Sequence, residues 1–309
     1  MMLLLLAALP ALFWDAAPDT APTLHDAGID RILVPPARLA SWKGVPGITA
    51  EAASLEGAVK LLPPTVNYRM QEATATSAPW IVANGWRFIR QPEGRFFYDV
   101  TGKQAALAAA EAFCYGANAM IRSDAAGLKP LAEMLSFLRT IAGEPLPPVA
   151  DIGYNDDGSA ASGEVMNLLV RDNLLFRLVA SPDPRLKVNV KLGTREYPLA
   201  DAKNPGTMAH AVRFNLTDEK RSLRIYGSQV VVARLTGSGE HLRVHLLNYA
   251  GATRRVEGLR VRVLGQYAKH QSWLADGAGV ELLDYSVDLD ATEFTLPELK
   301  MYAVVDLSR

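Results

Sequence analysis

Cysteine is almost absent from this sequence of 309 residues, because Cys114 is its only one. A single thiol cannot form an intramolecular disulfide and is too few for a cysteine-based zinc or iron–sulfur site. A metal would need histidine and carboxylate ligands, yet the five histidines are scattered. Even His241 and His245 would lie about 13 Å apart along a strand, too far for one zinc ion. We therefore predict no metal and no other cofactor.

Neither sign of charge is in excess. The sequence has 32 Lys and Arg residues and 33 Asp and Glu residues, which leaves a formal net charge of -1. No net positive field is therefore available to attract a polyanion. This balance argues against a nucleic-acid-binding protein, and we predict no nucleic-acid partner.

Hydrophobic runs of membrane length are missing as well. The apolar stretch from Met1 to Trp14 is too short to cross the roughly 30 Å hydrocarbon layer as a helix, so we predict no stable membrane anchor. It has the length of the apolar region of a secretory signal, with Ala16 and Ala17 for cleavage but no basic residue before it. Two interpretations stay open: a signal segment over residues 1–20 of a secreted or periplasmic protein, or a buried segment of a cytoplasmic one.

Hydrophobic residues make up 49% of the chain, enough to bury a sizeable core over about two domains. Trp86–Arg90 and Phe96–Val100 are aromatic and branched runs bounded by turn residues, which predicts two strands. An alanine-rich helix, a short strand at Ala119–Arg122 and a second helix capped by Asp124 follow. The alternation of strands and helices is typical of parallel α/β units.

A proline-rich stretch, Glu144–Val149, predicts a connector to a second region. One more small α/β unit follows this connector. The stretch HAVRFNLTDEKRSLR, which begins at His210, carries mixed charges, and we interpret it as a helix with a solvated face.

From about Ile225 the hydrophobic period changes to two. Leu242 and Val244, for example, alternate with Arg243 and His245, which predicts strands with one dry and one wet face. Turn residues separate these runs at intervals expected of an antiparallel sandwich. The C-terminal third is therefore predicted to be all-β.

Three stretches of this third are HLRVHLLNYAG, VEGLRVRVLG and ATEFTLPELKMYAVVDL. They resemble the small β-sandwich that closes many multidomain glycoside hydrolases, particularly those of the beta-galactosidase type. In that family the sandwich follows an α/β region of glutamine-amidotransferase-like form, which itself follows a TIM barrel. The stretch VADIGYNDDGSAASGEVMNLLVRDNLLFRLV resembles the opening of such an α/β region, and Phe96 to Asp124 resembles the last strand and helix turns of a hydrolase barrel.

The resemblance implies an α/β fold followed by an all-β fold. About 120 residues precede the proline-rich connector, whereas a complete eight-stranded barrel needs at least about 200. We therefore expect an incomplete TIM-barrel-like or open α/β region. The expected organisation, after the signal segment, is a barrel-like α/β region over residues 21–145, an amidotransferase-like α/β region over 146–224 and a β-sandwich over 225–309.

Two aspartates are the candidate catalytic residues. Glycoside hydrolysis usually needs two carboxyl groups, one to donate a proton and one to act as nucleophile or base. Asp99 and Asp124 both lie at the ends of predicted strands, where α/β barrels place their active sites. The alternative for Asp124 is that it caps the helix that follows.

Three further side chains are candidates for holding a sugar. Trp86, with Asn84 beside it, offers an aromatic face and an amide to a pyranose ring; the alternative is a tryptophan packed in the core. Arg122, next to the catalytic candidate Asp124, offers a guanidinium to a substrate oxygen. A structural ion pair is the alternative for Arg122.

An acidic pair, Asp156 and Asp157, follows one predicted strand and precedes a helix. Open α/β sheets bind ligands at that position, and two carboxylates suit sugar hydroxyls better than phosphate. No Gly-x-Gly-x-x-Gly or Walker loop occurs in this unit, which argues against a nucleotide. The alternative for the pair is an Asx turn with a helix cap.

Two hypotheses about function follow. The first is a glycoside hydrolase-like protein that acts on or binds carbohydrate and, if active, hydrolyses O-glycosyl bonds with Asp99 and Asp124. The second is a non-catalytic carbohydrate-binding or structural accessory protein that keeps the accessory domains of such an enzyme. Carbohydrate is the predicted partner.

Overall fold

The computed structural model of the protein describes residues 9–70, 77–275, 277 and 279–309. The chain forms two compact units. The first contains residues 9–65 and Gln91–Pro145, and the second contains Val66–Arg90, Leu146–Leu274 and residues 279–309. The start of the predicted signal segment, residues 1–8, lies outside the described residues.

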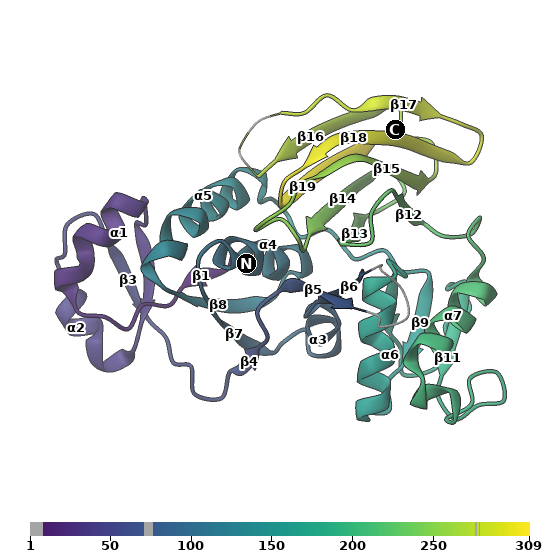
Figure 1. Ribbon diagram of the computed structural model, residues 1–309, viewed down its shortest axis with the longest axis horizontal. Helices are drawn as coiled ribbons and strands as arrows, with labels where there is room; N and C mark the ends of the chain where they lie inside the picture. Colours follow the sequence, from purple (N-terminus) through teal and green to yellow (C-terminus); the bar gives the residue numbers. More distant parts are fainter. Residues whose placement is uncertain (1–8, 71–76, 276, 278) are drawn as a thin grey trace, which may run out of the picture. The chain divides into compact units, whose positions relative to one another are not determined.

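A parallel sheet organises the first unit (Figure 1). Its strands run in the order β4 (Val59–Leu61), β7 (Arg95–Val100), β8 (Asn118–Ser123) and β1 (Ala11–Leu12). A parallel bridge between Phe13 and Leu33 continues the series to β2 (Arg31–Val34), which pairs with β3 (Thr49–Ala52). Among the described residues β3 and β4 do not pair with each other, so the sheet is open and no closed barrel forms.

Strand β1 is the described part of the predicted signal segment, and it lies inside the sheet. Leu12 is fully buried and Phe13 is 4% exposed. The Phe13 N–H donates to the Ile121 carbonyl at 2.8 Å, and the Trp14 N–H donates to the Leu33 carbonyl at 2.7 Å. These contacts bury Leu12 and Phe13 within the first unit.

Helices α4 (Gln104–Tyr115) and α5 (Ala125–Ile141) pack side by side against this sheet (Figure 1). The Tyr98 hydroxyl of β7 donates to the buried Glu111 carboxylate of α4 at 2.6 Å. Because side chains alternate along a strand, the neighbouring Asp99 lies on the face of the sheet opposite α4. The shorter helices are α1 (Ala21–Ala27), α2 (Leu39–Trp42) and the 3₁₀ helices Pro18–Thr20 and Pro36–Arg38.

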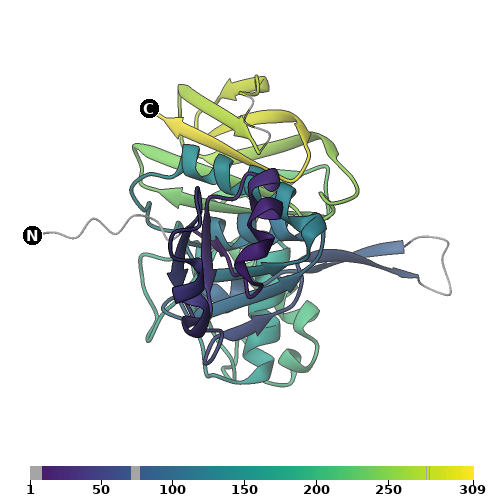
Figure 2. The same cartoon turned by 90° about the vertical axis from the view of Figure 1, so that its left-hand side faces the viewer.

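The second unit begins with β5 (Thr65–Met70), β6 (Ser77–Val82) and α3 (Gly85–Arg90). Figure 2 shows β5 and β6 as a two-stranded ribbon. A small parallel sheet follows, with the order β10 (Phe176–Leu178), β9 (Ile152–Asn155) and β11 (Val188–Lys191). The helices α6 (Ala160–Arg171) and α7 (Pro205–Leu216) contact each other, and α6 also contacts α3; a 3₁₀ helix covers Asp201–Lys203.

The strand predicted at Trp86–Arg90 is wrong, because these residues belong to helix α3. The helix begins where the Asn84 carbonyl accepts the N–H groups of Arg87 and Phe88, at 2.8 and 3.3 Å. Trp86 and Arg90 lie one turn apart on the same helix face. A Cβ atom at Gly163 of α6 would lie 3.0 Å from either side chain. Packing against α6 therefore accounts for the helix better than the local residue pattern does.

An antiparallel β-sandwich completes the second unit, as predicted (Figure 1). One sheet has the order β12 (Leu223–Tyr226), β15 (Val256–Leu264), β18 (Ala291–Leu299) and β17 (Leu283–Val287). The other has the order β13 (Val231–Gly237), β14 (His241–Asn248), β19 (Tyr302–Ser308) and β16 (Lys269–Leu274). The shared core includes the fully buried Val244, Val261 and Phe294. The protein is therefore an α/β fold followed by a sandwich.

His245 corrects the prediction of a wet face on β14, because it is only 5% exposed. Its Nδ1 lies 2.7 Å from the Tyr302 hydroxyl, and its Nε2 lies 3.3 Å from the Thr236 hydroxyl. Strand β14 is central, with β13 and β19 on either side. Burial holds the pKa of His245 well below its ordinary value of 6.5, and the nearby Arg234 and Arg243 lower this pKa further.

The buried neutral His245 makes stability depend on pH. Below the ordinary histidine pKa the unfolded chain binds a proton that the folded chain does not. We therefore expect the free energy of unfolding to fall as pH drops below about 6.5, by up to about 1.4 kcal/mol per pH unit. Urea unfolding across this range should show a smaller slope in His245→Gln. The variant His241→Gln changes an exposed histidine of the same strand and should keep the wild-type slope; an unchanged slope in His245→Gln would contradict the expectation.

Candidate functional site

The carboxyl ends of parallel strands share one edge of a sheet, and charged side chains gather there in the first unit. Asp99 of β7 and Arg122 of β8 are register partners. Arg122 donates to both carboxylate oxygens of Asp99, from Nε at 3.1 Å and from Nη2 at 2.6 Å. Lys60 of β4 donates to Asp99 at 3.2 Å, and Asp15, which follows β1, lies 3.8 Å from Arg122. We call Asp15, Lys60, Asp99 and Arg122 the carboxyl-edge cluster.

The carboxyl-edge cluster is ionised and accessible to solvent. The hydrogen bond from Arg122 is the main cause that lowers the pKa of Asp99 to about 2; partial burial opposes it and Lys60 adds to it. The exposed fractions of the side chains are 34% for Asp99, 37% for Arg122 and 60% for Lys60. At neutral pH the Asp99 carboxylate is therefore ionised: it accepts hydrogen bonds and has no proton to donate.

Asp124 follows β8 at the same edge and serves as the N-cap of α5. Its Oδ1 accepts the N–H of Gly127 at 3.0 Å and the N–H of Gly102 at 2.9 Å. The carboxylate thus joins the first turn of α5 to the loop before α4. This is the capping role that was the alternative to catalysis.

The two predicted catalytic residues therefore share an edge but have different partners. Asp99 is paired with two cations, whereas the bonded oxygen of Asp124 is held by main-chain amides. Arg122, predicted to hold a substrate oxygen, is bonded to Asp99, as in the structural alternative.

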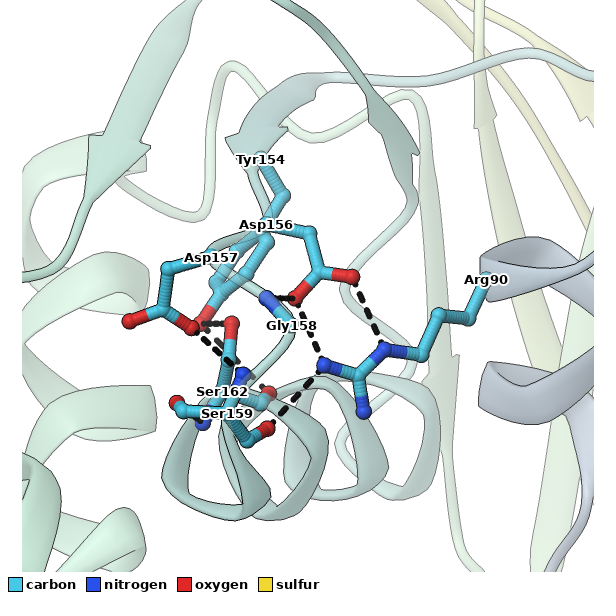
Figure 3. Close-up of polar contacts among 7 residues, drawn as sticks. All are labelled: Arg90, Tyr154, Asp156, Asp157, Gly158, Ser159 and Ser162. Atoms are coloured by element: carbon cyan, nitrogen blue, oxygen red, sulfur yellow. Dashed lines mark hydrogen bonds and ion pairs between the residues drawn. The ribbon is translucent and has the colours of Figure 1, made fainter.

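Asp156 and Asp157 lie in the turn between β9 and α6, which we call the β9 turn (Figure 3). Arg90 of α3 points at Asp156 and donates to both its carboxylate oxygens at 2.8 Å. Asp156 also accepts the Gly158 N–H at 3.0 Å, and Asp157 accepts the Ser159 N–H at 2.9 Å. Both aspartates therefore form Asx turns, which was the alternative interpretation of this pair.

Hydrogen bonding keeps the acids of the β9 turn ionised. Burial raises the pKa of Asp156, but hydrogen bonds from Arg90 and the Gly158 N–H outweigh it, so the net pKa is lowered. Hydrogen bonds from Ser159 lower the pKa of Asp157. Burial raises the pKa of the nearby Tyr154 to about 12, so its hydroxyl stays neutral.

Trp86 and Asn84 are buried in the second unit, at 9% and 1% exposure. The Arg87 guanidinium lies 4.2 Å from the centre of the Trp86 ring. The opposing helix approaches the same ring at Gly163. Trp86 therefore packs α3 onto α6 and does not offer an open ring face. This is the packed tryptophan that was the alternative interpretation.

The partners of these acids are not evident from the sequence. Lys60 lies in a stretch of weak periodicity, and Arg90 was assigned to a strand rather than to a helix that faces the β9 turn.

Within the described residues no group of three or more His, Cys, Asp or Glu side chains could hold a metal ion. No helix in the part of the chain that the structure describes is both long and apolar enough to cross a membrane.

Comparison with known proteins bears on the fold. No protein-family model matches the chain, and no curated protein sequence matches it. Its structure is similar to that of alpha-L-fucosidase isoenzyme 2 from Paenibacillus thiaminolyticus, with a TM-score of 0.54 and 9% identity over 85% of this chain and 68% of the fucosidase. The chain has a glycoside-hydrolase-like fold. The beta-galactosidase from Rahnella sp. R3 is a more distant neighbour, with a TM-score of 0.37 and 10% identity over 96% of this chain and 60% of that enzyme.

Proposed function

We propose that this protein binds carbohydrate at the carboxyl-edge cluster of its first unit. The observation that carries the proposal is the ionised Asp99–Arg122 pair, which lies at the carboxyl end of a parallel sheet on the face opposite α4. Catalytic and binding groups of α/β barrels come from this end of the strands. The glycoside-hydrolase-like fold supports a sugar as the ligand.

The chemistry of the cluster suits hydroxyl groups. The carboxylate of Asp99 accepts hydrogen bonds from sugar O–H groups, while Arg122 and Lys60 donate to sugar oxygens. These three side chains come from neighbouring strands, which fixes their spacing. Asn84, Trp86, Asp156 and Asp157 are committed to contacts inside the second unit and are not part of the proposed site.

Hydrolysis of an O-glycosyl bond is the second candidate function. It is favoured by the position of Asp99 and Asp124 at the ends of adjacent parallel strands. In that case Asp99, ionised at neutral pH, is the nucleophile or base and Asp124 is the proton donor. Asp124 would then have to donate a proton while its carboxylate still accepts the main-chain N–H groups of Gly102 and Gly127. Because hydrolysis makes this extra demand, we rank binding first.

Isothermal titration and an aryl-glycoside panel test both functions. The panel contains the α-L-fucoside and the β-D-galactoside, and the corresponding free sugars serve for titration. We expect Asp99→Asn to raise the Kd of a bound sugar about tenfold or more, because a hydrogen bond to a charged group is worth about 1.5 to 3 kcal/mol. We expect no turnover of the aryl glycosides.

Two outcomes would contradict the ranking or the site. Turnover by the wild type that is lost in Asp99→Asn and Asp124→Asn would establish hydrolysis, and asparagine keeps the capping ability of Asp124. Equal sugar affinity in the wild type and Asp99→Asn would show that the carboxyl-edge cluster is not the sugar site. Asp30→Asn is the matched control, since Asp30 forms an exposed ion pair with Arg139 in the same unit, and it should bind like the wild type.

A further inference from the structure

The second unit contains a polar cavity of about 390 Å³ between the end of α6, α7 and β12. Its charged lining consists of four arginines and two aspartates: Arg171, Arg213, Arg221, Arg224, Asp172 and Asp218. The lining therefore has two more positive than negative side chains. The size falls in the range of small-molecule sites, roughly 300 to 1,000 Å³.

One carboxylate in the cavity is shared by three guanidinium groups. Asp218 lies 3.0 Å from Arg213, 3.1 Å from Arg221 and 3.8 Å from Arg224. Hydrogen bonds from Arg213, the main cause, and from Arg221 lower the pKa of Asp218 to about 2, against the opposing effect of partial burial. Asp172 also acts electrostatically on Arg213 and Arg221. Two carboxylates against the four guanidinium groups of the lining still leave an excess of positive charge.

Arg221 is the buried member of this group, with 5% exposure. Its Nη2 donates to the carbonyls of Asp172 and Asn173, at 3.3 and 3.0 Å, but its buried Nε has no hydrogen-bond partner among the residues that the structure describes. Burial lowers the pKa of Arg221, which reflects the cost of holding the charge there. An anion in the cavity would offset that cost.

Two guanidinium groups of the cavity, those of Arg171 and Arg224, lie over aromatic rings. Arg224 lies 5.0 Å from the centre of the Tyr226 ring, and Arg171 lies 3.5 Å from the centre of the Trp80 ring. Stacking on a ring restrains a guanidinium and leaves its N–H edges available to a bidentate acceptor. The exposed fractions are 49% for Arg213 and 20% for Arg224. Arg213 already donates to both carboxylate oxygens of Asp218, from Nε at 3.3 Å and from Nη2 at 3.0 Å, so its remaining N–H groups and those of Arg224 are the ones that a ligand would meet.

We propose that this cavity binds an acidic sugar through a carboxylate or sulfate group held by Arg213 and Arg224, with Arg221 as the buried charge behind them. That a sugar carries the anion rests on the proposed carbohydrate function. The preference for an oxyanion rests on the arginines alone. A carboxylate has two acceptor oxygens and a sulfate ester has three terminal ones, and either group can bind a guanidinium through two of them. Both sources of the anion are therefore tested.

Isothermal titration of the full chain tests the proposal. The probes are D-glucuronate, glucose 6-sulfate, neutral glucose and inorganic sulfate, at one ionic strength. We expect at least one acidic sugar to bind more tightly than glucose and inorganic sulfate. Arg224→Gln should raise its Kd about tenfold or more, whereas Arg255→Gln, which removes an exposed arginine of the same unit, should leave it unchanged.

Distinct results would overturn each part. If none of the anions binds, or if Arg224→Gln and Arg213→Gln both bind like the wild type, the cavity is not the site. If inorganic sulfate binds as tightly as the acidic sugars, the sugar is not recognised. If Arg224→Gln proves unfolded by circular dichroism, Arg213→Gln decides. Asp99→Asn should not change the binding of the acidic sugars, so failure of the carboxyl-edge cluster and failure of the cavity are separable.

Discussion

Replacing Leu12 by alanine is expected to lower the free energy of unfolding of the first unit by about 3 to 5 kcal/mol. Leu12 is fully buried in β1, which lies between β8 and β2. Truncation leaves a cavity at the strand that joins the two halves of the parallel sheet. Urea unfolding measures the loss, and hydrogen exchange of peptides from β7 and β8 assigns it to the first unit.

Leu9→Ala is the matched control for this substitution. Leu9 is 40% exposed, so its truncation should change stability by less than about 0.5 kcal/mol. Equal effects of the two substitutions would show that β1 is not part of the folded sheet.

Asp151→Ala is expected to destabilise the second unit by about 2 to 3 kcal/mol, because hydrogen bonds to a buried charged group are worth about 1.5 to 3 kcal/mol and the Lys187 charge that remains is 30% exposed. Asp151 is 1% exposed. Its Oδ1 accepts from Lys187 Nζ at 2.8 Å and from the Ser222 hydroxyl at 2.6 Å, and its Oδ2 accepts the Ser222 N–H at 2.9 Å. Truncation would leave the Ser222 N–H without its acceptor at the junction of β9, β11 and β12, whereas Lys187 would keep the Lys220 carbonyl and the Ser222 hydroxyl.

Urea unfolding of three variants measures the role of Asp151. Asp151→Asn keeps one acceptor oxygen and should be destabilised less than Asp151→Ala. Glu257→Ala removes an exposed carboxylate that is paired with Arg255 in the same unit, and it should cost less than about 1 kcal/mol. A loss in Asp151→Ala no larger than that of Glu257→Ala would show that the network contributes little.

The sequence predicted elements well where local signals decide them. The strand at Phe96–Val100, the helix after Asp124 and the sandwich strands are confirmed, because period and helix caps are properties of neighbouring residues. Trp86–Arg90 was wrong because its helix depends on contact with α6 at Gly163, far along the chain. His245 was placed on a wet face because alternation alone does not reveal that Thr236 and Tyr302 of the neighbouring strands contact its ring.

The candidate sites were predicted unevenly for the same reason. The order of strands and helices places Asp99 and Asp124 at one edge, but the pairing of β4 with β7 that brings Lys60 to Asp99 is not visible in the sequence. The charged stretch from His210 was interpreted as a solvated helix face. In the structure α7 ends at Leu216, and Arg213, Asp218 and Arg221 gather at the cavity instead.

The path of the chain between the two units has a consequence for biosynthesis. Val66–Arg90 belongs to the second unit, although the chain before and after it belongs to the first. Arg90 is made 66 residues before Asp156, its partner. During translation α3 therefore emerges without the surface it will cover, and the buried side of Trp86 stays open to chaperones until α6 has been synthesised. The second unit can fold only after its C-terminal residues have been synthesised. The parallel sheet of the first unit has all its strands once β8 has left the ribosome.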